Sequence, residues 1–280
     1  MRRHLVPLLA LAICAHLAPV SAADYPGALA DHRVARGTGL IAEAWLADPT
    51  TRYQHYVLGS QYEAGSLVVR LSDGTLRKLV LPETSVFEDR QPRLADLDGD
   101  GVDEIILVRS TLDRGAALAV VALKGDQLTI VAETPPTGRR HTWLNPAGIA
   151  DYDGDGRLDI AYVQMPHVLG LLRVWTFRDG QLVEIAQVPG VSNHLIGSPH
   201  LAMSATADFD GDGIADLALP SLDRRSVRVL KFKGGAREIF RQSLPAPAVG
   251  DFVLDQIGGR PVVGVGLQGG LKFGFIPRIE

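Results

Sequence analysis

Three acidic loops contain the residues of this sequence that are best suited to bind a metal ion. Each loop reads Asp-x-Asp-Gly-Asp-Gly and ends in a further carboxylate, over residues 96–104, 151–159 and 208–216. Carboxylates at this density repel one another unless a cation lies among them, and calcium accepts about six to eight such hard oxygen ligands. The paired glycines allow the backbone to wrap tightly around an ion. The sequence therefore predicts calcium as the cofactor.

The position of each residue in the loop predicts its role. Positions 1, 3, 5 and 9 supply carboxylates, and position 7 supplies a backbone carbonyl. The predicted ligands are Asp96, Asp98, Asp100, Val102, Glu104, Asp151, Asp153, Asp155, Arg157, Asp159, Asp208, Asp210, Asp212, Ile214 and Asp216. We expect the ions to be structural. The alternative is that a partner's carboxylate or a sugar hydroxyl completes the shell of one ion.

Helical calcium loops are excluded by position 12 of each loop. An EF-hand needs a bidentate Glu there and a helix on either side. Here that position holds Leu107, Tyr162 and Leu219, each inside a β-rich run. Strands rather than helices must therefore hold these loops in place.

A repeat of short strands is predicted to position the loops. Each acidic loop is followed by a continuous apolar run and then by a tight-turn pair between β-rich segments, which is typical of a hairpin. These pairs are Gly125-Asp126, Asp179-Gly180 and Gly234-Gly235. Degenerate copies near Asp48 and Asp251 carry the pairs Asp73-Gly74 and Gly269-Gly270. The pattern predicts an all-β fold, a β-propeller of about five four-stranded blades closed by the chain termini, in a single domain at residues 23–280.

The acidic loop followed by an apolar strand resembles the FG-GAP/VCBS repeat. The motif Asp-x-Asp-Gly-Asp-Gly-x-x-Asp/Glu carries this resemblance, which is strong over residues 87–240. The resemblance implies a β-propeller like the head of integrin α-chains, calcium in the blade loops, and a binding role outside the cytoplasm. It implies no single activity, because the family has none.

A second candidate site lies in the connections that enter the acidic loops. Two arginines beside an aromatic residue suit an anionic or sugar ligand, and such connections meet on one face of a propeller. The candidate ligand-binding residues are Arg139, Arg140, His141, Trp143, Asn145 and His194. The alternative is a solvated surface over a packed Trp143.

The N-terminus predicts secretion. Residues 1–22 combine a basic start, a short apolar run and small residues before a cleavage site, which is typical of a signal peptide. Cys14 is the only cysteine and lies in this leader, where lipidation is an alternative to having no role. We therefore expect a periplasmic or extracellular protein without a membrane span. The formal charge of −4 gives no basic surface for nucleic acid.

No nucleophile motif, Walker loop or dinucleotide fingerprint occurs in the sequence. We therefore expect a non-catalytic, monomeric module that binds a protein or a glycan. One alternative is an enzyme acting on glycans, for which Glu63, Glu88 and Asp89 are the nearest candidates among the acidic residues. The other is a structural subunit of a cell-surface assembly.

Overall fold

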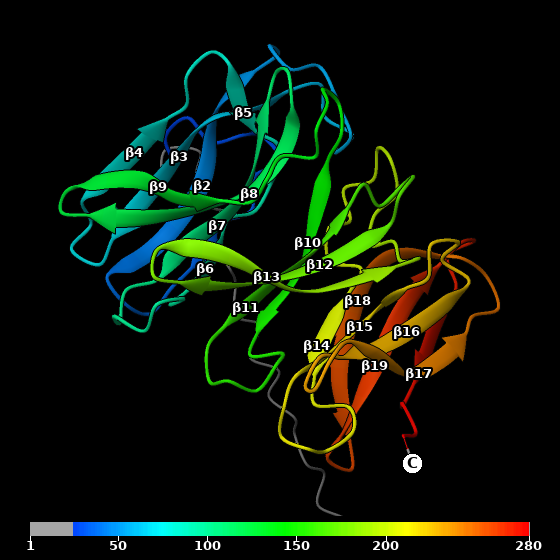
Figure 1. Ribbon diagram of the computed structural model, residues 1–280. Helices are drawn as coiled ribbons and strands as arrows, with labels where there is room; N and C mark the ends of the chain where they lie inside the picture. The colour runs from blue at the N-terminus through cyan, green and yellow to red at the C-terminus, as the bar shows by residue number, and fades with distance from the viewer. Residues whose placement is uncertain (1–24, 280) are drawn as a thin grey trace, which may run out of the picture.

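The computed structural model describes residues 25–279, and these form an all-β protein (Figure 1). The prediction of an all-β chain is therefore confirmed. None of the described residues builds a helix long and apolar enough to cross a membrane. The predicted signal peptide at residues 1–22, with Cys14, lies outside the described residues.

Consecutive strands form groups along the chain. The first group contains β1 (Ala35–Arg36), β2 (Ile41–Thr50), β3 (Glu63–Leu71) and β4 (Leu76–Val80). The second contains β6 (Arg93–Ala95), β7 (Glu104–Thr111), β8 (Gly115–Lys124) and β9 (Gln127–Glu133). The third contains β10 (Leu144–Ala150), β11 (Asp159–Gln164), β12 (Leu171–Arg178) and β13 (Gln181–Pro189). The fourth contains β14 (Ala205–Ala207), β15 (Asp216–Pro220), β16 (Ser226–Lys231) and β17 (Arg237–Ser243), and the last β18 (Ala248–Ile257), β19 (Arg260–Leu267) and β20 (Lys272–Phe275).

Within each group every strand pairs antiparallel with the next. In the second, third and fourth groups the second strand is an apolar run, as in Ile105–Val108, and it is buried on both faces. Core side chains pack between neighbouring groups, so that Ile106 and Val120 of the second group share a cluster with Ile160 and Trp175 of the third. Burial of this apolar surface holds adjacent sheets together.

A short extra strand, β5 (Ser85–Phe87), joins the first two groups. Phe87 pairs with Ala64 of β3 and with Arg109 of β7, so these groups form one nine-stranded sheet. The third, fourth and last groups each form a separate sheet. No strand pairing within residues 25–279 joins the last sheet to the first, so the predicted closure of a ring stays a prediction.

The two degenerate copies of the repeat lie differently from the three acidic ones. Asp48 lies inside β2 and Asp251 inside β18, whereas each acidic loop joins the first strand of its group to the second. The turn at Asp73-Gly74 joins the third strand of its group to the fourth, as the middle turn pairs do. The turn at Gly269-Gly270 instead joins β19 to β20, the second and third strands of the last group.

Antiparallel order places loops at alternate ends of a sheet. The acidic loops join first to second strands, so they share one end with the hairpin turns between third and fourth strands. The loops between second and third strands, and the connections between groups, lie at the other end. The two candidate sites predicted above therefore lie at opposite ends of the sheets.

Candidate functional site

The first residue of each acidic loop organises the loop backbone. In the first loop, Asp96 accepts hydrogen bonds from the N–H groups of Gly99 and Gly101, at 2.8 and 3.0 Å. Both glycines have positive φ, 78° and 87°, a conformation that other residues rarely adopt. The same pattern recurs from Asp151 and Asp208. The local sequence thus folds each loop around its own carboxylates.

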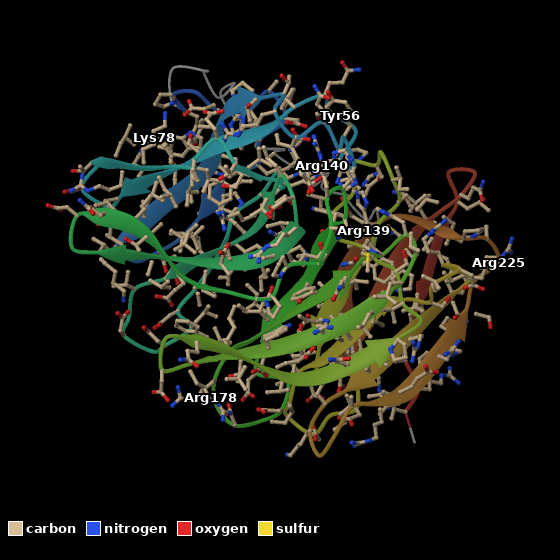
Figure 2. The ribbon with its side chains drawn as sticks, turned by 45° about the horizontal axis from the view of Figure 1, so that its top comes forward. Tyr56, Lys78, Arg139, Arg140, Arg178 and Arg225 are labelled. Atoms are coloured by element: carbon tan, nitrogen blue, oxygen red, sulfur yellow. The ribbon has the colours of Figure 1, made fainter. Side chains whose placement is uncertain are left out.

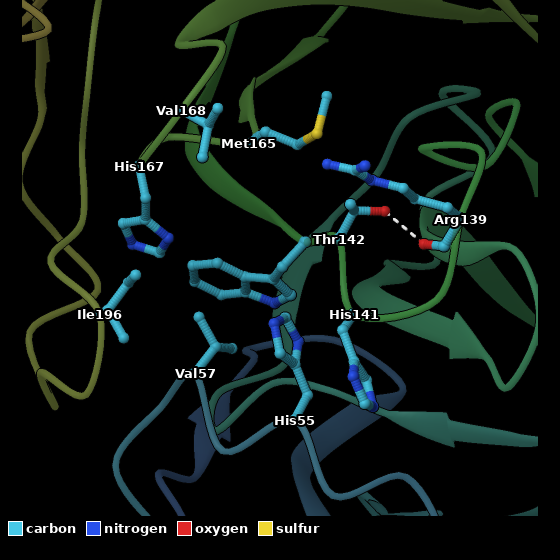
Figure 3. Close-up of a pocket in the computed structure, with 10 residues that line it drawn as sticks. His55, Val57, Arg139, His141, Thr142, Met165, His167, Val168 and Ile196 are labelled. Atoms are coloured by element: carbon cyan, nitrogen blue, oxygen red, sulfur yellow. Dashed lines mark hydrogen bonds between the residues drawn. The ribbon is translucent and has the colours of Figure 1, made fainter.

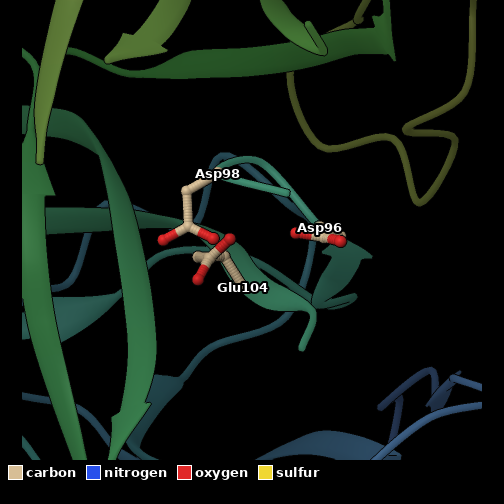
Figure 4. Close-up of side chains that lie close together, drawn as sticks. All are labelled: Asp96, Asp98 and Glu104. Atoms are coloured by element: carbon tan, nitrogen blue, oxygen red, sulfur yellow. The ribbon is translucent and has the colours of Figure 1, made fainter. Parts of the chain in front are cut away.

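Positions 1, 3 and 9 of each loop come together. Ligand oxygens of Asp96, Asp98 and Glu104 lie within 4.8 Å of one another (Figure 4). The equivalent groups in the other loops are Asp151, Asp153 and Asp159, and Asp208, Asp210 and Asp216. Position 9 is the first residue of the second strand, so a strand fixes the deepest carboxylate of each group.

The buried carboxylate at position 9 fits a cation. Asp159 accepts a hydrogen bond from the N–H of Tyr152 through Oδ2, at 3.0 Å, while its Oδ1 is buried and has no partner among the described residues. Asp216 repeats this arrangement with Phe209. An unpaired buried carboxylate oxygen is costly, and a calcium ion would supply the missing partner.

The electrostatics of the three groups agree with this fit. Burial, together with the neighbouring carboxylates, raises the pKa of Glu104 to about 7. Burial is also the main cause that raises the pKa of Asp159 and of Asp216 to about 6. A bound cation would offset both effects, because it favours the charged form of each carboxylate.

The side chains at position 5 lie outside the three carboxylate groups, and their ion pairs differ from loop to loop. Asp100, Asp155 and Asp212 each accept a hydrogen bond from the N–H of the residue two positions later. In the second loop Arg178 pairs with Asp155, and in the third Lys231 contacts both Asp210 and Asp212. No ion pair to the first loop's predicted carboxylates occurs within residues 25–279. The backbone carbonyl ligands expected at position 7, from Val102, Arg157 and Ile214, stay a prediction.

A cavity of about 320 Å³ lies at the other end of the sheets (Figure 3). Its lining includes residues from the β2–β3 loop, the connection before β10, the β11–β12 loop and the connection before β14. These residues are His55, Val57, Arg139, His141, Thr142, Trp143, Met165, His167, Val168 and Ile196. Val168 and Ile196 at its mouth are 75% and 72% exposed, whereas Trp143 is only 3% exposed.

A buried carboxylate orients one histidine of the cavity. Nδ1 of His55 lies 2.5 Å from Oε1 of Glu88, whose Oε2 accepts a hydrogen bond from Ser110. Glu88 also accepts the indole N–H of Trp143 through its backbone oxygen, at 2.9 Å. Because His55 donates through Nδ1, its other ring nitrogen remains available to a ligand.

Two further histidines, His167 and His194, form a hydrogen-bond relay beside the cavity. Nε2 of His194 lies 2.9 Å from the carbonyl oxygen of Ser198, which can only accept, so this nitrogen carries a proton. Burial lowers the pKa of His194 to about 4 and of His167 to about 3, so both rings are neutral at pH 7. Nδ1 of His194 therefore accepts from Nε2–H of His167, at 2.9 Å. Nδ1 of His167 is left as a hydrogen-bond acceptor.

The predicted ligand-binding residues divide into two sets. Arg139, His141 and Trp143 line the cavity, and His194 supports it through His167. Arg140 instead donates to the backbone oxygen of Tyr53, at 3.2 Å. Asn145 is fully buried and donates to the backbone oxygens of Asn193 and Leu201, which is a packing role.

His55 and His167 are not among the residues predicted from the sequence. Each lies far along the chain from the candidate stretch at Arg139–Asn145, and neither forms part of a motif. Their shared location follows only from the strand order, because both lie in loops between the second and third strands of their groups. Their location between the second and third strands was the sequence signal that could have identified them.

Comparison with known proteins identifies the repeat. Residues 96–162 and 151–219 match the model of the FG-GAP-like repeat family. No curated protein sequence matches the chain significantly.

Two solved structures resemble the chain at low sequence identity. The rhamnogalacturonan lyase YesW matches with a TM-score of 0.52 and 16% identity, over 84% of this chain and 46% of that one. Saccharomyces cerevisiae Sqt1 matches with a TM-score of 0.49 and 13% identity, over 77% of this chain and 54% of that one. The chain thus spans about half the length of these proteins.

Proposed function

We propose that this chain, whose residues 96–219 carry FG-GAP-like repeats, is a calcium-stabilised β-propeller module that binds a protein or glycan outside the cytoplasm. It has about five blades, one for each group of consecutive strands, and acts as a non-catalytic monomer. The repeats support the extracytoplasmic location, since such repeats are typically extracellular. Weak extracellular calcium modules bind at about 10⁻⁴–10⁻³ M, which suits exposed loops of this kind.

Calcium has a structural role in this proposal. Positions 1, 3 and 9 of each loop would hold the ion, as in Asp151, Asp153 and Asp159. The ion would neutralise carboxylates that otherwise repel one another beside the start of a buried strand. Each ion therefore fixes the first and second strands of one group relative to each other.

The cavity lined by Trp143 and the histidines is the observation that carries the binding role. It combines exposed aliphatic side chains at its mouth with a few polar groups inside, which is typical of ligand sites. Large apolar side chains exposed around a cavity are typical of an interaction surface. The acidic loops lie at the other end of the sheets, so the ions do not take part in contacts with the ligand.

An exposed residue at the cavity mouth allows a direct test. Ile196→Asp should abolish ligand binding without unfolding the protein, because Ile196 is 72% exposed. Ile257→Asp is the matched control, since Ile257 is 61% exposed and lies at the end of β18, away from the cavity. Binding of peptide and oligosaccharide panels would be measured by calorimetry. Equal binding by both variants would contradict the proposal.

One observation favours an enzyme as the second candidate. Glu63 and Glu88 are buried close to His55, and burial followed by the charge of Glu88 raises the pKa of Glu63. A buried carboxyl group with a raised pKa beside a second carboxylate is typical of acid–base catalysis. Asp89 is excluded from such a role because it accepts hydrogen bonds from Arg90, Arg93 and Val108. Release of reducing ends from a polysaccharide, lost in Glu88→Gln, would favour this candidate over the binding module.

A further inference from the structure

The mouth of the cavity is apolar, and this limits the class of ligand. Val168 and Ile196 are largely exposed and Val57 lies beside them in the lining. Burying sugar hydroxyls against aliphatic side chains leaves them without hydrogen-bond partners, which is costly. Trp143 offers little open ring surface, because it is 3% exposed and His167 and His194 pack against it. These features favour an aliphatic side chain of a protein over a sugar.

An unpaired cation lines this cavity. Among residues 25–279, the guanidinium of Arg139 has no hydrogen bond or ion pair, although the backbone oxygen of Arg139 accepts from Thr142. Figure 3 shows its side chain reaching over the cavity toward Met165. Glu88, the buried carboxylate that contacts the lining residue His55, is already engaged by His55 and Ser110. The cavity therefore suits a ligand that brings its own negative charge.

The histidine relay adds a third requirement. His167 keeps an unprotonated Nδ1 on a ring that lines the cavity, because its Nε2–H is donated to His194. A ligand group near this nitrogen must therefore donate a hydrogen bond. An amide N–H meets this requirement.

An aliphatic side chain, a negative charge and an N–H donor occur together in the last residue of a polypeptide. We propose that the cavity binds the apolar C-terminal residue of a protein partner, with its carboxylate at Arg139 and its backbone N–H at His167. This inference rests on the proposed binding function and names the partner's chemistry. The volume of about 320 Å³ is at the small end of ligand cavities, which suits one residue rather than a long segment.

The test compares acetyl-Gly-Gly-Leu with the same peptide amidated at its C-terminus. A charge-assisted hydrogen bond to Arg139 should make the free acid bind about tenfold more tightly than the amide. Calorimetry on the full chain measures both. Arg139→Met should bind acid and amide equally. Arg225→Met is the matched control, because Arg225 is exposed and lies well apart from Arg139 (Figure 2), and it should keep the tenfold preference.

Three results would overturn the inference. One is a preference for the free acid that persists in Arg139→Met. Another is binding of a neutral oligosaccharide but not of the peptide, lost in Ile196→Asp, which would leave the proposed binding function intact. If neither the peptide nor the oligosaccharides bind, both the inference and the proposed function fail.

Discussion

The acidic loops and the cavity lie at opposite ends of the same sheets and are built in opposite ways. Each carboxylate group comes from nine consecutive residues, such as 96–104, and is held by hydrogen bonds within its own loop. The cavity takes His55 from a loop of the first group, His141 from the connection between the second and third groups, and His167 from a loop of the third. The loops can form wherever their own strands form, whereas the cavity exists only when several groups pack together.

Under the proposed function, this difference separates stability from recognition. A buried carboxylate oxygen of Asp159 and one of Asp216 have no partner among residues 25–279, so a cation bound there would stabilise the third and fourth groups of strands. The exposed cavity mouth contributes little to folding, so its residues are free to serve a ligand.

Calcium removal should have the largest effect. An ion present at about a hundredfold excess over its Kd stabilises the folded state by about 2.7 kcal/mol. Because 1 kcal/mol shifts the Tm of a domain of this size by about 2–4 °C, excess chelator should lower the Tm by at least about 5 °C. Differential scanning calorimetry measures this change, and magnesium chloride added back without calcium serves as the control. An unchanged Tm in chelator would contradict structural calcium.

Calcium binding by one loop can be removed without changing the other two loops. Asp153→Ala removes a member of the second carboxylate group, so it should abolish one calcium site and lower the free energy of unfolding in calcium by about 1–3 kcal/mol. Asp113→Ala, at an exposed position outside the loops, is the control. Calcium stoichiometry by calorimetry and unfolding in urea measure both effects. If Asp153→Ala binds as much calcium as the native chain, the ligand assignment is wrong.

The raised pKa values predict how the effect of chelator depends on pH. Without calcium, Glu104 has a folded pKa of about 7, above its ordinary value of 4.5. The folded state then binds more protons than the unfolded state between these values, so its stability falls as pH rises through 7. The loss of Tm on adding chelator should therefore be smaller at pH 5.5 than at pH 8, a comparison in which the contribution of the buried histidines His167 and His194 cancels. A larger loss of Tm at pH 5.5 would contradict the electrostatic argument.

The basic side chains that pair with the second and third loops should make the calcium affinities of the three loops unequal. Lys231 contacts Asp210 and Asp212 in the third loop and would compete with an ion bound there. Lys231→Met should raise calcium affinity at that loop several-fold and lower stability in chelator. Lys233→Met is the control, because its ammonium lies 3.9 Å from Asp212 and is about half exposed. Titration with terbium, read by luminescence, measures the affinity; equal affinities in both variants would refute the competition.

Arg140 should give the smallest effect. Its guanidinium donates to the backbone oxygen of Tyr53 on an exposed surface and does not line the cavity. Arg140→Ala should therefore change the free energy of unfolding by less than about 0.5 kcal/mol. A loss of more than about 1 kcal/mol in urea unfolding would show that this end of the molecule also carries stability.

Local spacing made the loops predictable from sequence. Asp98 and Glu104 are brought together by two glycine turns and the start of a strand, all within nine residues. The turn pairs Gly125-Asp126 and Asp179-Gly180 likewise mark hairpins between third and fourth strands, as predicted.

Contacts between residues far apart in the chain could not be predicted from the sequence patterns. Nothing near His55 signals that it lies beside His141, since their proximity depends on how two groups of strands pack. The burial of Asn145 also depends on that packing, because its partners Asn193 and Leu201 come from a distant connection. Asp48 follows the spacing of the repeat, but it lies inside the long strand β2 and not in a loop.

The short strand β5 has a consequence for how the chain opens. Its backbone is hydrogen-bonded to both β3 and β7, so the first two groups cannot separate without breaking ladder bonds on one side of it. Among residues 25–279 no strand ladder joins the later groups, which are linked by one isolated β-bridge, Val191 to Ser221, and by a few single backbone hydrogen bonds. Amide hydrogens of β3 and β7 should therefore exchange together as one cooperative unit. A truncation that keeps an intact fragment would begin after β9, not between β4 and β6.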